Sequence, residues 1–402
     1  MFLTSHPFAG QAKSLSPLEA LSWNSFFRSV GMGFIGVFVP VYLFILGRQH
    51  GGLPGGLIVI ACFSLIQRAV IMSLSIPMAK LVKKLGFRRS IFLGTVFEAA
   101  FFLLLIGARY LPNLVWLTAI DGGFAVLFYW LARLSLISTD GQTDHIGRSL
   151  GTLSILEHGS GILGPFAGAV IATLFGFDVL FVIGMLLLLF SSLPMFYMPP
   201  HHHKGTVSFK GFWNWCADKT NRWMAIGHLG RGLDDYVAGW AWTLFVFVFV
   251  GNLEVFGGLT SAVLLSSVLA VYIASSLFDH HRLTLGRVGA VAALTAAFRI
   301  VRGLAKSIPQ LFLFDSATRI VTPFYQMGAD GVMYLAAKSR NPLGFFAYRE
   351  IIYSFAHICA AISLLFLASN PNVWWVMWLI GSLGVLLGVG LAVRPNASKS
   401  FA

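Results

Sequence analysis

Long apolar runs alternate with short polar segments along almost the whole chain. A helix that crosses a bilayer needs about 20 mostly apolar residues. The pattern therefore predicts an all-α polytopic membrane protein with twelve transmembrane helices. The expected runs, numbered 1 to 12 in chain order, are 19–46, 55–79, 90–108, 113–137, 149–173, 177–197, 222–250, 255–278, 286–304, 309–337, 343–369 and 373–393.

The polar segments between the runs differ in charge. The segment between runs 2 and 3 holds five cations and no acid around a single glycine, Gly86. Segments after even-numbered runs carry most of the cations, whereas those after odd-numbered runs carry few. Positive charge is retained on the cytoplasmic side, so both termini are expected in the cytoplasm and the protein in an inner or plasma membrane. The five cations are Lys80, Lys83, Lys84, Arg88 and Arg89.

The longest polar segment falls between runs 6 and 7 and divides the chain into two pseudo-symmetric halves of six helices each. The predicted parts follow from this division. They are a cytoplasmic N-terminal segment at 1–18, an N-terminal half at 19–197, a central cytoplasmic loop at 198–220, a C-terminal half at 221–393 and a cytoplasmic tail at 394–402.

Composition narrows the class of protein. The chain is 57% hydrophobic and only 11% charged, whereas soluble domains are about 25% charged. The net charge of +13 sits in short segments between apolar runs, which favours a membrane surface over nucleic acid as the partner. No phosphate-binding loop, HExxH sequence or nucleophile elbow is present, so neither an enzyme nor a cofactor is expected. The histidines at 201–203 and 280–281 lack the spacing of a metal site, and no metal is predicted.

Two six-helix halves, a central loop and a cationic turn between runs 2 and 3 resemble the major facilitator superfamily of secondary transporters. The family signature in that turn is roughly Gly-x-Leu-Ala-Asp-Arg-x-Gly-Arg-Arg. Aligned on Gly86, Lys83 stands at the position of the acid, and Arg88 matches a cation. A weaker echo, SSLFDHHRLTLGR, places Asp279 at the acid position between runs 8 and 9. We therefore expect the cytoplasmic latch to be more sensitive to Asp279→Asn than to Lys83→Ala.

Run 5 carries a third match. Gly151, Ser160, Gly164, Pro165 and Gly168 resemble the Gly-x8-Gly-x3-Gly-Pro-x2-Gly pattern of the family's antiporter subgroup, with Ser160 replacing one glycine. The resemblance implies a monomer in the lipid bilayer that exports a small organic solute in exchange for protons by alternating access. A facilitator or symporter of the same fold is the alternative. From other classes, a receptor or scaffold without transport and a membrane enzyme also remain open.

Ionisable side chains inside a membrane are costly when unpaired, so they are expected to face a cavity or one another. In the resembled fold, helices 1, 4, 7 and 10 line the central cavity. The resemblance therefore implies one set of substrate or proton residues. These are Arg28, Asp121, Arg133, Arg231, Asp234, Asp235, Asp315 and Arg319.

Spacing suggests how some of these charges pair. Asp315 and Arg319 are four residues apart and share one helix face, so they either pair with each other or serve the cavity. Asp235 can pair with Arg231 in the same way. Asp234 is then rotated by one residue about the helix axis, away from that pair. Asp234 is expected to face the cavity and to exchange protons. The alternative is a cluster at the cytoplasmic rim.

The remaining charges are interpreted from their places in the runs. Asp121 is expected in the outer half of run 4, as a proton or substrate site or paired with an arginine. Two pairs are secondary candidates. Glu157 and His158 are expected to form either a proton relay or a packed, hydrogen-bonded pair. Arg349 and Glu350 are expected to belong to a structural network. Four further charges are expected to be structural or to reach outward, namely Arg68, Glu98, Arg299 and Arg302.

Overall fold

The computed structural model describes residues 15–140, 153, 156–157, 159, 161–199, 205–280 and 283–393. In these ranges the chain forms helices and turns and no strand. The long helices are α1 Pro17–Ile35, α2 Phe38–Leu85, α3 Phe87–Gly107, α4 Leu114–Asp140, α6 Gly164–Ser191, α8 Arg222–Tyr236, α9 Trp242–Val250, α10 Leu253–Asp279, α11 Leu285–Val301, α12 Ile308–Lys338, α13 Pro342–Leu367 and α14 Val373–Gly388. The short ones are η1 Leu193–Tyr197, α7 Phe209–Ala217, η2 Lys219–Asn221, η3 Val237–Ala241, η4 Arg302–Leu304 and η5 Val389–Ala392.

Local capping chemistry fixes where several helices begin. The Ser16 hydroxyl accepts from the Glu19 amide at 3.3 Å, and the Glu19 carboxylate accepts from the Ser16 amide at 2.9 Å. This reciprocal arrangement is a capping box. At α13, the Asn341 side chain accepts from the Gly344 amide at 3.2 Å, and Pro342 takes the first helical position, where no amide hydrogen is needed.

Two of the long helices each contain a reversal of the chain. Gly52 in α2 has φ 60° and ψ −150°, and Gly176 in α6 has φ 87° and ψ 167°. Only glycine adopts this backbone region without large strain. The packing proves the reversals, because Gly56 lies against Phe44 across the first turn. Across the second turn, the segments on both sides of Gly176 pack on α1 near Gly33 and Gly31.

The described residues contain eight helical stretches that are long and apolar enough to cross a membrane. Two of these stretches hold the reversals and therefore count as two spans each. With α11 and α12, the described part of the chain contains helices from all twelve predicted spans, and span 5 is described mainly from Gly161 onward. Spans 1 and 2 divide at Gly51–Gly52, spans 5 and 6 divide at Gly176, and α8, η3 and α9 together make span 7.

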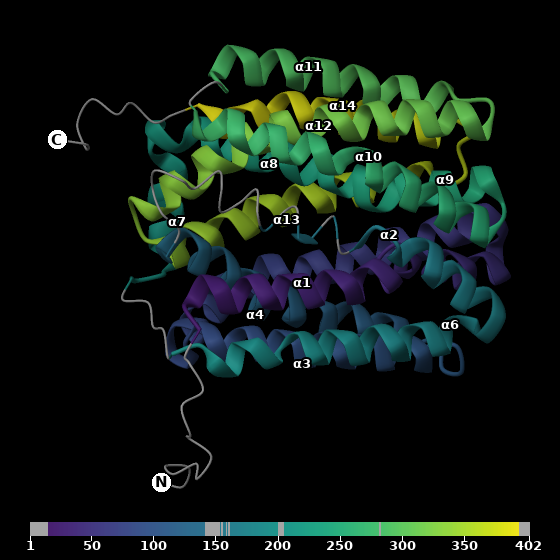
Figure 1. Cartoon of the computed structure of the whole chain (residues 1–402), viewed down its shortest axis with the longest axis horizontal. Helices are drawn as coiled ribbons and strands as arrows, with labels where there is room; N and C mark the ends of the chain where they lie inside the picture. Colours follow the sequence, from purple (N-terminus) through teal and green to yellow (C-terminus); the bar gives the residue numbers. More distant parts are fainter. Residues whose placement is uncertain are drawn as a thin grey trace, which may run out of the picture.

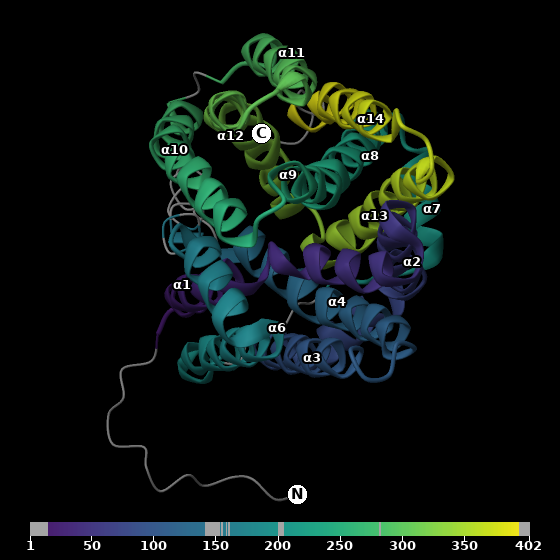
Figure 2. The same cartoon turned by 90° about the vertical axis from the view of Figure 1, so that its right-hand side faces the viewer.

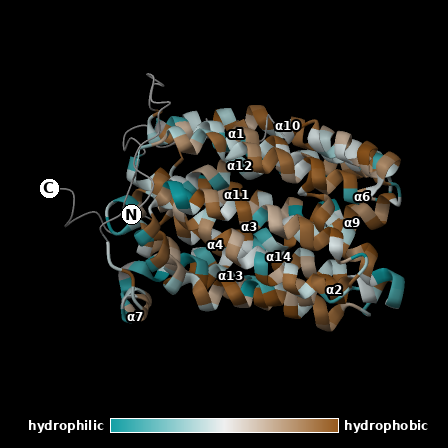
Figure 3. Cartoon of the chain, turned by 90° about the horizontal axis from the view of Figure 1, so that it is seen from below, coloured by the Kyte–Doolittle hydropathy of each residue, from teal (hydrophilic) through white to brown (hydrophobic). Residues whose placement is uncertain are grey.

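The spans are arranged as two bundles lying side by side, as Figure 1 and Figure 2 show. The first bundle contains α1, α2, α3, α4 and α6, and the second contains α8 to α14. The bundles meet mainly along α2 with α13 and along α6 with α10. Hydrophobic residues run along the helices in Figure 3, and many large apolar side chains are more than half exposed, such as Leu103, Leu269 and Phe366. The fold is that of an all-α polytopic membrane protein.

One end of the two bundles gathers the cationic turns, and we call it the cationic end. Here the Arg88 guanidinium donates to the Met198 carbonyl at 3.1 Å, and the Leu15 amide donates to the Tyr197 carbonyl at 3.2 Å. In the second bundle, Arg340 donates to the Asn221 side chain. The helix α7 lies at the same end in Figure 1. The opposite, outer end carries the exposed pair Arg109–Asp178, with 3.3 Å between Nη1 and Oδ2.

Aromatic side chains join the two bundles in their outer halves. Ring centroids lie 5.9 Å apart for Phe63 and Trp240, and 6.0 Å apart for Phe38 and Phe256. The Phe166 amide also donates to the Ser261 hydroxyl at 3.0 Å, which links α6 to α10. Aromatic pairs of this kind each contribute about 0.5–1.5 kcal/mol beyond the area that they bury. The outer half of the interface is therefore closed by packed rings.

Candidate functional site

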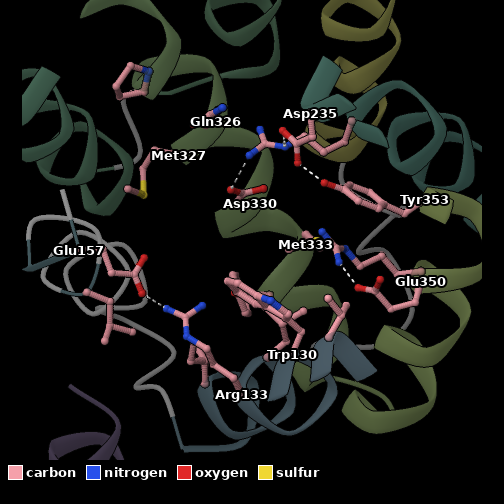
Figure 4. A pocket seen from close by; sticks show the side chains of 18 of the residues that line it. Trp130, Arg133, Glu157, Asp235, Gln326, Met327, Asp330, Met333, Glu350 and Tyr353 are labelled. Atoms are coloured by element: carbon pink, nitrogen blue, oxygen red, sulfur yellow. Dashed lines mark hydrogen bonds and ion pairs between the residues drawn. The ribbon is translucent and has the colours of Figure 1, made fainter. Parts of the chain in front are cut away.

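A cavity of about 440 Å³ lies between the two bundles. Its walls come from α2 and α4 of the first bundle and from α8, α10, α12 and α13 of the second, with Leu153 and Glu157 beside them. Figure 4 shows its charged side chains pointing inward from both sides. Among the described lining residues are four arginines, Arg68, Arg133, Arg231 and Arg349, and four carboxylates, Glu157, Asp235, Asp330 and Glu350.

The cavity lies nearer to the cationic end than to the outer end. Arg133 stands two helical turns before α4 ends at Asp140, and Asp330 stands about two turns before α12 ends at Lys338. Two turns of an α-helix are about 11 Å long. The packed outer rings therefore separate this cavity, which we call the central cavity, from the outer end.

Three charged groups form a cluster on the second-bundle side of the central cavity. Arg231 Nε lies 3.3 Å from Asp235 Oδ1, and Arg231 Nη2 lies 3.9 Å from Asp330 Oδ2. The Tyr353 hydroxyl donates to the other oxygen of Asp235. Two carboxylates thus share one guanidinium, and Asp330 has the longer contact. We call Arg231, Asp235 and Asp330 the acid–arginine cluster.

Two further arginines of the central cavity each have a carboxylate partner. Arg133 donates to Glu157 within the first bundle, and its guanidinium lies 4.9 Å from the centre of the Trp130 ring. Arg349 donates to the neighbouring Glu350 and lies 4.4 Å from the centre of the Tyr353 ring. These charges are neutralised locally.

Arg68 is different from the other three arginines. Its guanidinium lies 5.4 Å from the centre of the Tyr353 ring, and it makes no hydrogen bond or ion pair with another described residue. A cation in a membrane interior without a carboxylate partner is costly. Arg68 is therefore the residue of the central cavity best placed to bind an anion.

Several residues predicted from the sequence do lie at the central cavity. Arg133, Arg231 and Asp235 line it, as do the secondary candidates Glu157, Arg349 and Glu350. Asp235 pairs with Arg231 as its spacing predicts. His158 lies outside the described residues, so its proposed relay with Glu157 has no structural description.

The prediction that Asp234 faces the cavity is wrong. Its side chain is fully buried inside the second bundle, where Arg299 Nη2 lies 3.0 Å from Oδ1. The cause is the helical rotation of about 100° per residue, which turns Asp234 away from Asp235. The expectation that Arg299 reaches outward is also wrong, because its guanidinium points into the second bundle and contacts Asp234.

The predicted pair of Asp315 with Arg319 is also wrong. Asp315 Oδ1 lies 3.2 Å from Arg302 Nη1, and Arg302 is buried with its guanidinium 3.6 Å from the centre of the Trp242 ring. Arg302 thus does not reach outward either. Arg319 makes no ion pair with another described residue and does not line the central cavity. Asp315 thus pairs with Arg302, which lies outside its own helix, and not with Arg319 as the spacing suggested.

Arg28 and Asp121 lie elsewhere in the first bundle. Arg28 donates twice to Glu98, at 2.7 Å for the Nη2–Oε1 contact, and both residues line a second cavity. Asp121 lies two turns from the outer start of α4, as expected from its run, and its Oδ2 has no hydrogen-bond partner among the described residues. Neither residue lines the central cavity.

The lining residues that the sequence did not assign to the central cavity include Trp130, Asp330 and Tyr353, and also Arg68, which was expected to be structural. Asp330 had a signal, because Pro323, Gln326, Asp330 and Tyr334 recur at the spacing of one helix face. Arg68 had none, since its run belongs to a helix that the resemblance places outside the cavity. Its side chain enters because α2 packs directly on α13.

The loop motifs have a structural role where they are described. Gly86 has φ 82° and ψ 160°, a region that only glycine adopts without large strain, and it separates α2 from α3. A Cβ atom on Gly164 would lie 2.3 Å from the carbonyl carbon of Gly33, so spans 1 and 5 pack backbone to backbone beside Pro165. Lys83 is half-buried in the last turn of α2. The side chain of Asp279, and residues Gly151 and Ser160, lie outside the description.

Comparisons with solved structures identify the fold. The E. coli fucose:proton symporter superposes with a TM-score of 0.66 over 94% of this chain and 97% of its own, at 13% identity. The human organic anion transporter MFSD10 (TETRAN) superposes with a TM-score of 0.69 over 94% of this chain and 98% of its own, at 12% identity. Neither protein-family models nor curated protein sequences gave a match.

The arrangement of the chain is therefore the major facilitator superfamily fold. The comparison covers nearly the whole chain and both bundles. It defines the fold, whereas the chemistry of the cavity depends on this chain's own side chains.

Proposed function

We propose that the protein is a secondary active transporter that carries a small organic solute across a membrane by alternating access. The observation that carries this proposal is the central cavity, with four arginines and four carboxylates supplied by both bundles. Charges at this depth are expensive and mark substrate or ion pathways. A site shared by two bundles suits a mechanism in which the bundles rock around the bound solute.

The orientation follows from charge. The cationic end faces the cytoplasm of an inner or plasma membrane, because positive turns are retained there. Both termini then lie on the cytoplasmic side. The N-terminal segment, the first half, the central loop and the second half end at residues 18, 197, 220 and 393, and the cytoplasmic tail follows. The central cavity is the inward-facing site, and the outer aromatic contacts are the closed gate. The protein works as a monomer in lipid, without a cofactor and without nucleic acid.

Protons are the coupling ion in this proposal. The acid–arginine cluster carries two negative charges and one positive charge, so uptake of one proton neutralises it. Asp330 is the proton acceptor, because its contact with Arg231 is the longer one, whereas the equally exposed Asp235 also accepts from the Tyr353 hydroxyl. The buried Asp234 has no contact with water and is not the acceptor. The name of one structural neighbour, a fucose:proton symporter, supports coupling to protons.

Two directions of coupling have separate support. Export by proton antiport is favoured by the Gly164–Pro165 motif of run 5. Symport is favoured by the balance of charge in the central cavity. A proton on the acid–arginine cluster leaves Arg68, which has no ion-pair partner among the described residues, free to hold an anionic solute. In antiport the solute and the proton compete, whereas in symport each increases the binding of the other.

The test uses the full chain in proteoliposomes with a pH-sensitive dye inside and a panel of organic anions, cations and sugars outside. At least one solute is expected to move protons, and Asp330→Asn is expected to abolish that movement. Asp178→Asn, which alters an exposed pair at the outer end, is the matched control and is expected to retain it. Failure of every solute to move, or full proton movement with Asp330→Asn, would contradict the proposal.

A further inference from the structure

A second cavity, of about 210 Å³, lies within the first bundle beside the central cavity. Its walls come from α1, α2, α3 and α4, and from Trp240 of the second bundle. Most of the lining is apolar or aromatic, including Met32, Val39, Phe63, Phe101 and Phe102. We call it the aromatic cavity.

The charges of the aromatic cavity are already satisfied. Arg28 and Glu98 bind each other, and the Arg28 guanidinium lies 4.1 Å from the centre of the Tyr129 ring. The Tyr129 hydroxyl donates to Asn24 at 2.9 Å. An ionic ligand would have to break a partly buried pair, which is costly. The aromatic cavity therefore suits an uncharged, apolar group.

The size of the aromatic cavity sets the size of that group. An apolar cavity of about 150 Å³ in a protein can hold benzene. A cavity of about 210 Å³ therefore accommodates one substituted aromatic ring. Phe63, Phe101 and Trp240 can contact such a ring edge to face, which is the preferred geometry of aromatic pairs.

Residues of α4 and α2 form the boundary between the two cavities. Val126 and Trp130, one helical turn apart on α4, line both cavities. On α2, Gln67 lines the aromatic cavity and the next residue, Arg68, lines the central cavity. Arg68, which has no ion-pair partner among the described residues, thus lies on the same helix as a lining residue of the aromatic cavity. The shared residues Val126 and Trp130 make the two cavities neighbours, so one ligand with an anionic group and an apolar group can occupy both.

We infer that the two cavities form one binding site for an amphipathic organic anion. Its anionic group binds Arg68 in the central cavity, and its aromatic or bulky apolar group occupies the aromatic cavity past Trp130. This inference rests on the proposed transport function for its biological role. Binding alone tests the inference, so the two can fail separately.

The experiment measures binding of 3-phenylpropionate, propionate and 3-phenylpropanol to the full chain in lipid nanodiscs by calorimetry. The unsubstituted chain is expected to bind 3-phenylpropionate at least about tenfold more tightly than either other probe. Ala125→Phe fills the aromatic cavity, so it is expected to bind 3-phenylpropionate no more tightly than propionate. Ile120→Phe, exposed on the same helix, is the matched control and is expected to retain the tighter binding of 3-phenylpropionate. Arg68→Gln is expected to bind 3-phenylpropionate no more tightly than 3-phenylpropanol.

Val39→Phe fills the aromatic cavity from the start of α2 and replaces Ala125→Phe as the test variant if Ala125→Phe does not fold. The inference is overturned if a folded cavity-filling variant keeps the preference for the ring, or if Arg68→Gln keeps the preference for the carboxylate. If the binding pattern holds but no probe or panel solute crosses proteoliposomes, the binding site stands and the transport function falls. If panel solutes cross but none of the three probes binds, the transport function stands and this inference falls.

Discussion

Two consecutive carboxylates on α8 lie in two different regions of the molecule. Asp235 enters the central cavity, where its side chain is 31% exposed and contacts Arg231 and Tyr353. Asp234 enters the interior of the second bundle, where its side chain is 0% exposed and contacts Arg299. Two aspartates on the same helical turn thus differ in role: Asp235 belongs to the candidate site, and Asp234 belongs to a packed ion pair. The direction of the side chain, and not its depth in the membrane, separates the two roles.

The two regions should respond differently to substitution. Removing one partner of a fully buried ion pair leaves an uncompensated charge and costs about 3–5 kcal/mol. A partly exposed charge in a cavity can be hydrated, so its removal costs about 0–1 kcal/mol. Substitutions inside the second bundle should therefore reduce stability, whereas those in the central cavity should change binding and transport.

The largest effect on stability is expected from Asp234→Ala. It leaves Arg299 buried without its partner and should lower the free energy of unfolding by about 3–5 kcal/mol. Denaturant unfolding in detergent measures the change. The double variant Asp234→Leu with Arg299→Met removes both charges and should recover most of the loss. A double variant as unstable as the single one would show that the charge pair is not the cause.

A somewhat smaller loss is expected from Arg302→Met. Its guanidinium lies 3.6 Å from the centre of the Trp242 ring and 3.2 Å from Asp315, so the substitution removes a cation–π contact and leaves a carboxylate unpaired. The expected loss is about 3 kcal/mol. Arg319→Met, on the same helix as Asp315 but without an ion pair in the described chain, is the control. Equal losses for the two variants would contradict the assignment of Asp315 to Arg302.

An intermediate effect is expected where spans 1 and 5 touch. Gly164→Ala places a Cβ atom 2.3 Å from the backbone of Gly33, so the two spans have to separate, at a cost of about 1–3 kcal/mol. Gly159→Ala is the matched control in the same span, because its Cβ atom meets nothing within 4 Å. Thermal unfolding compares the two. Similar melting temperatures for both variants would show that this contact adapts without cost.

The sequence predicted the spans well because the bilayer imposes length and apolarity on every crossing helix. It predicted the central cavity less well for an equally physical reason. A run that is apolar on all sides does not reveal its rotation, so Asp234 was assigned to the wrong region. Pairs such as Arg302 with Asp315 depend on tertiary packing, which spacing along one helix does not encode. Arg68 was expected to be structural, because only the packing of α2 on α13 brings it to the cavity.

The smallest effect on stability is expected from Asp235→Asn, one residue from the most sensitive position. Its side chain is partly exposed, and Arg231 keeps Asp330 as a second partner, so the loss should be below about 1 kcal/mol. Transport should show the opposite ranking, with a larger effect for Asp235→Asn than for a substitution of Asp234. The neutral amide leaves Arg231 and Asp330 as a balanced pair that no longer needs a proton, so solute should no longer move protons across the membrane. A proton-movement assay in proteoliposomes, beside the unfolding measurement, checks both parts. A large loss of stability with unchanged proton movement would mean that Asp235 is as structural as Asp234, and that rotation on α8 does not separate the two roles.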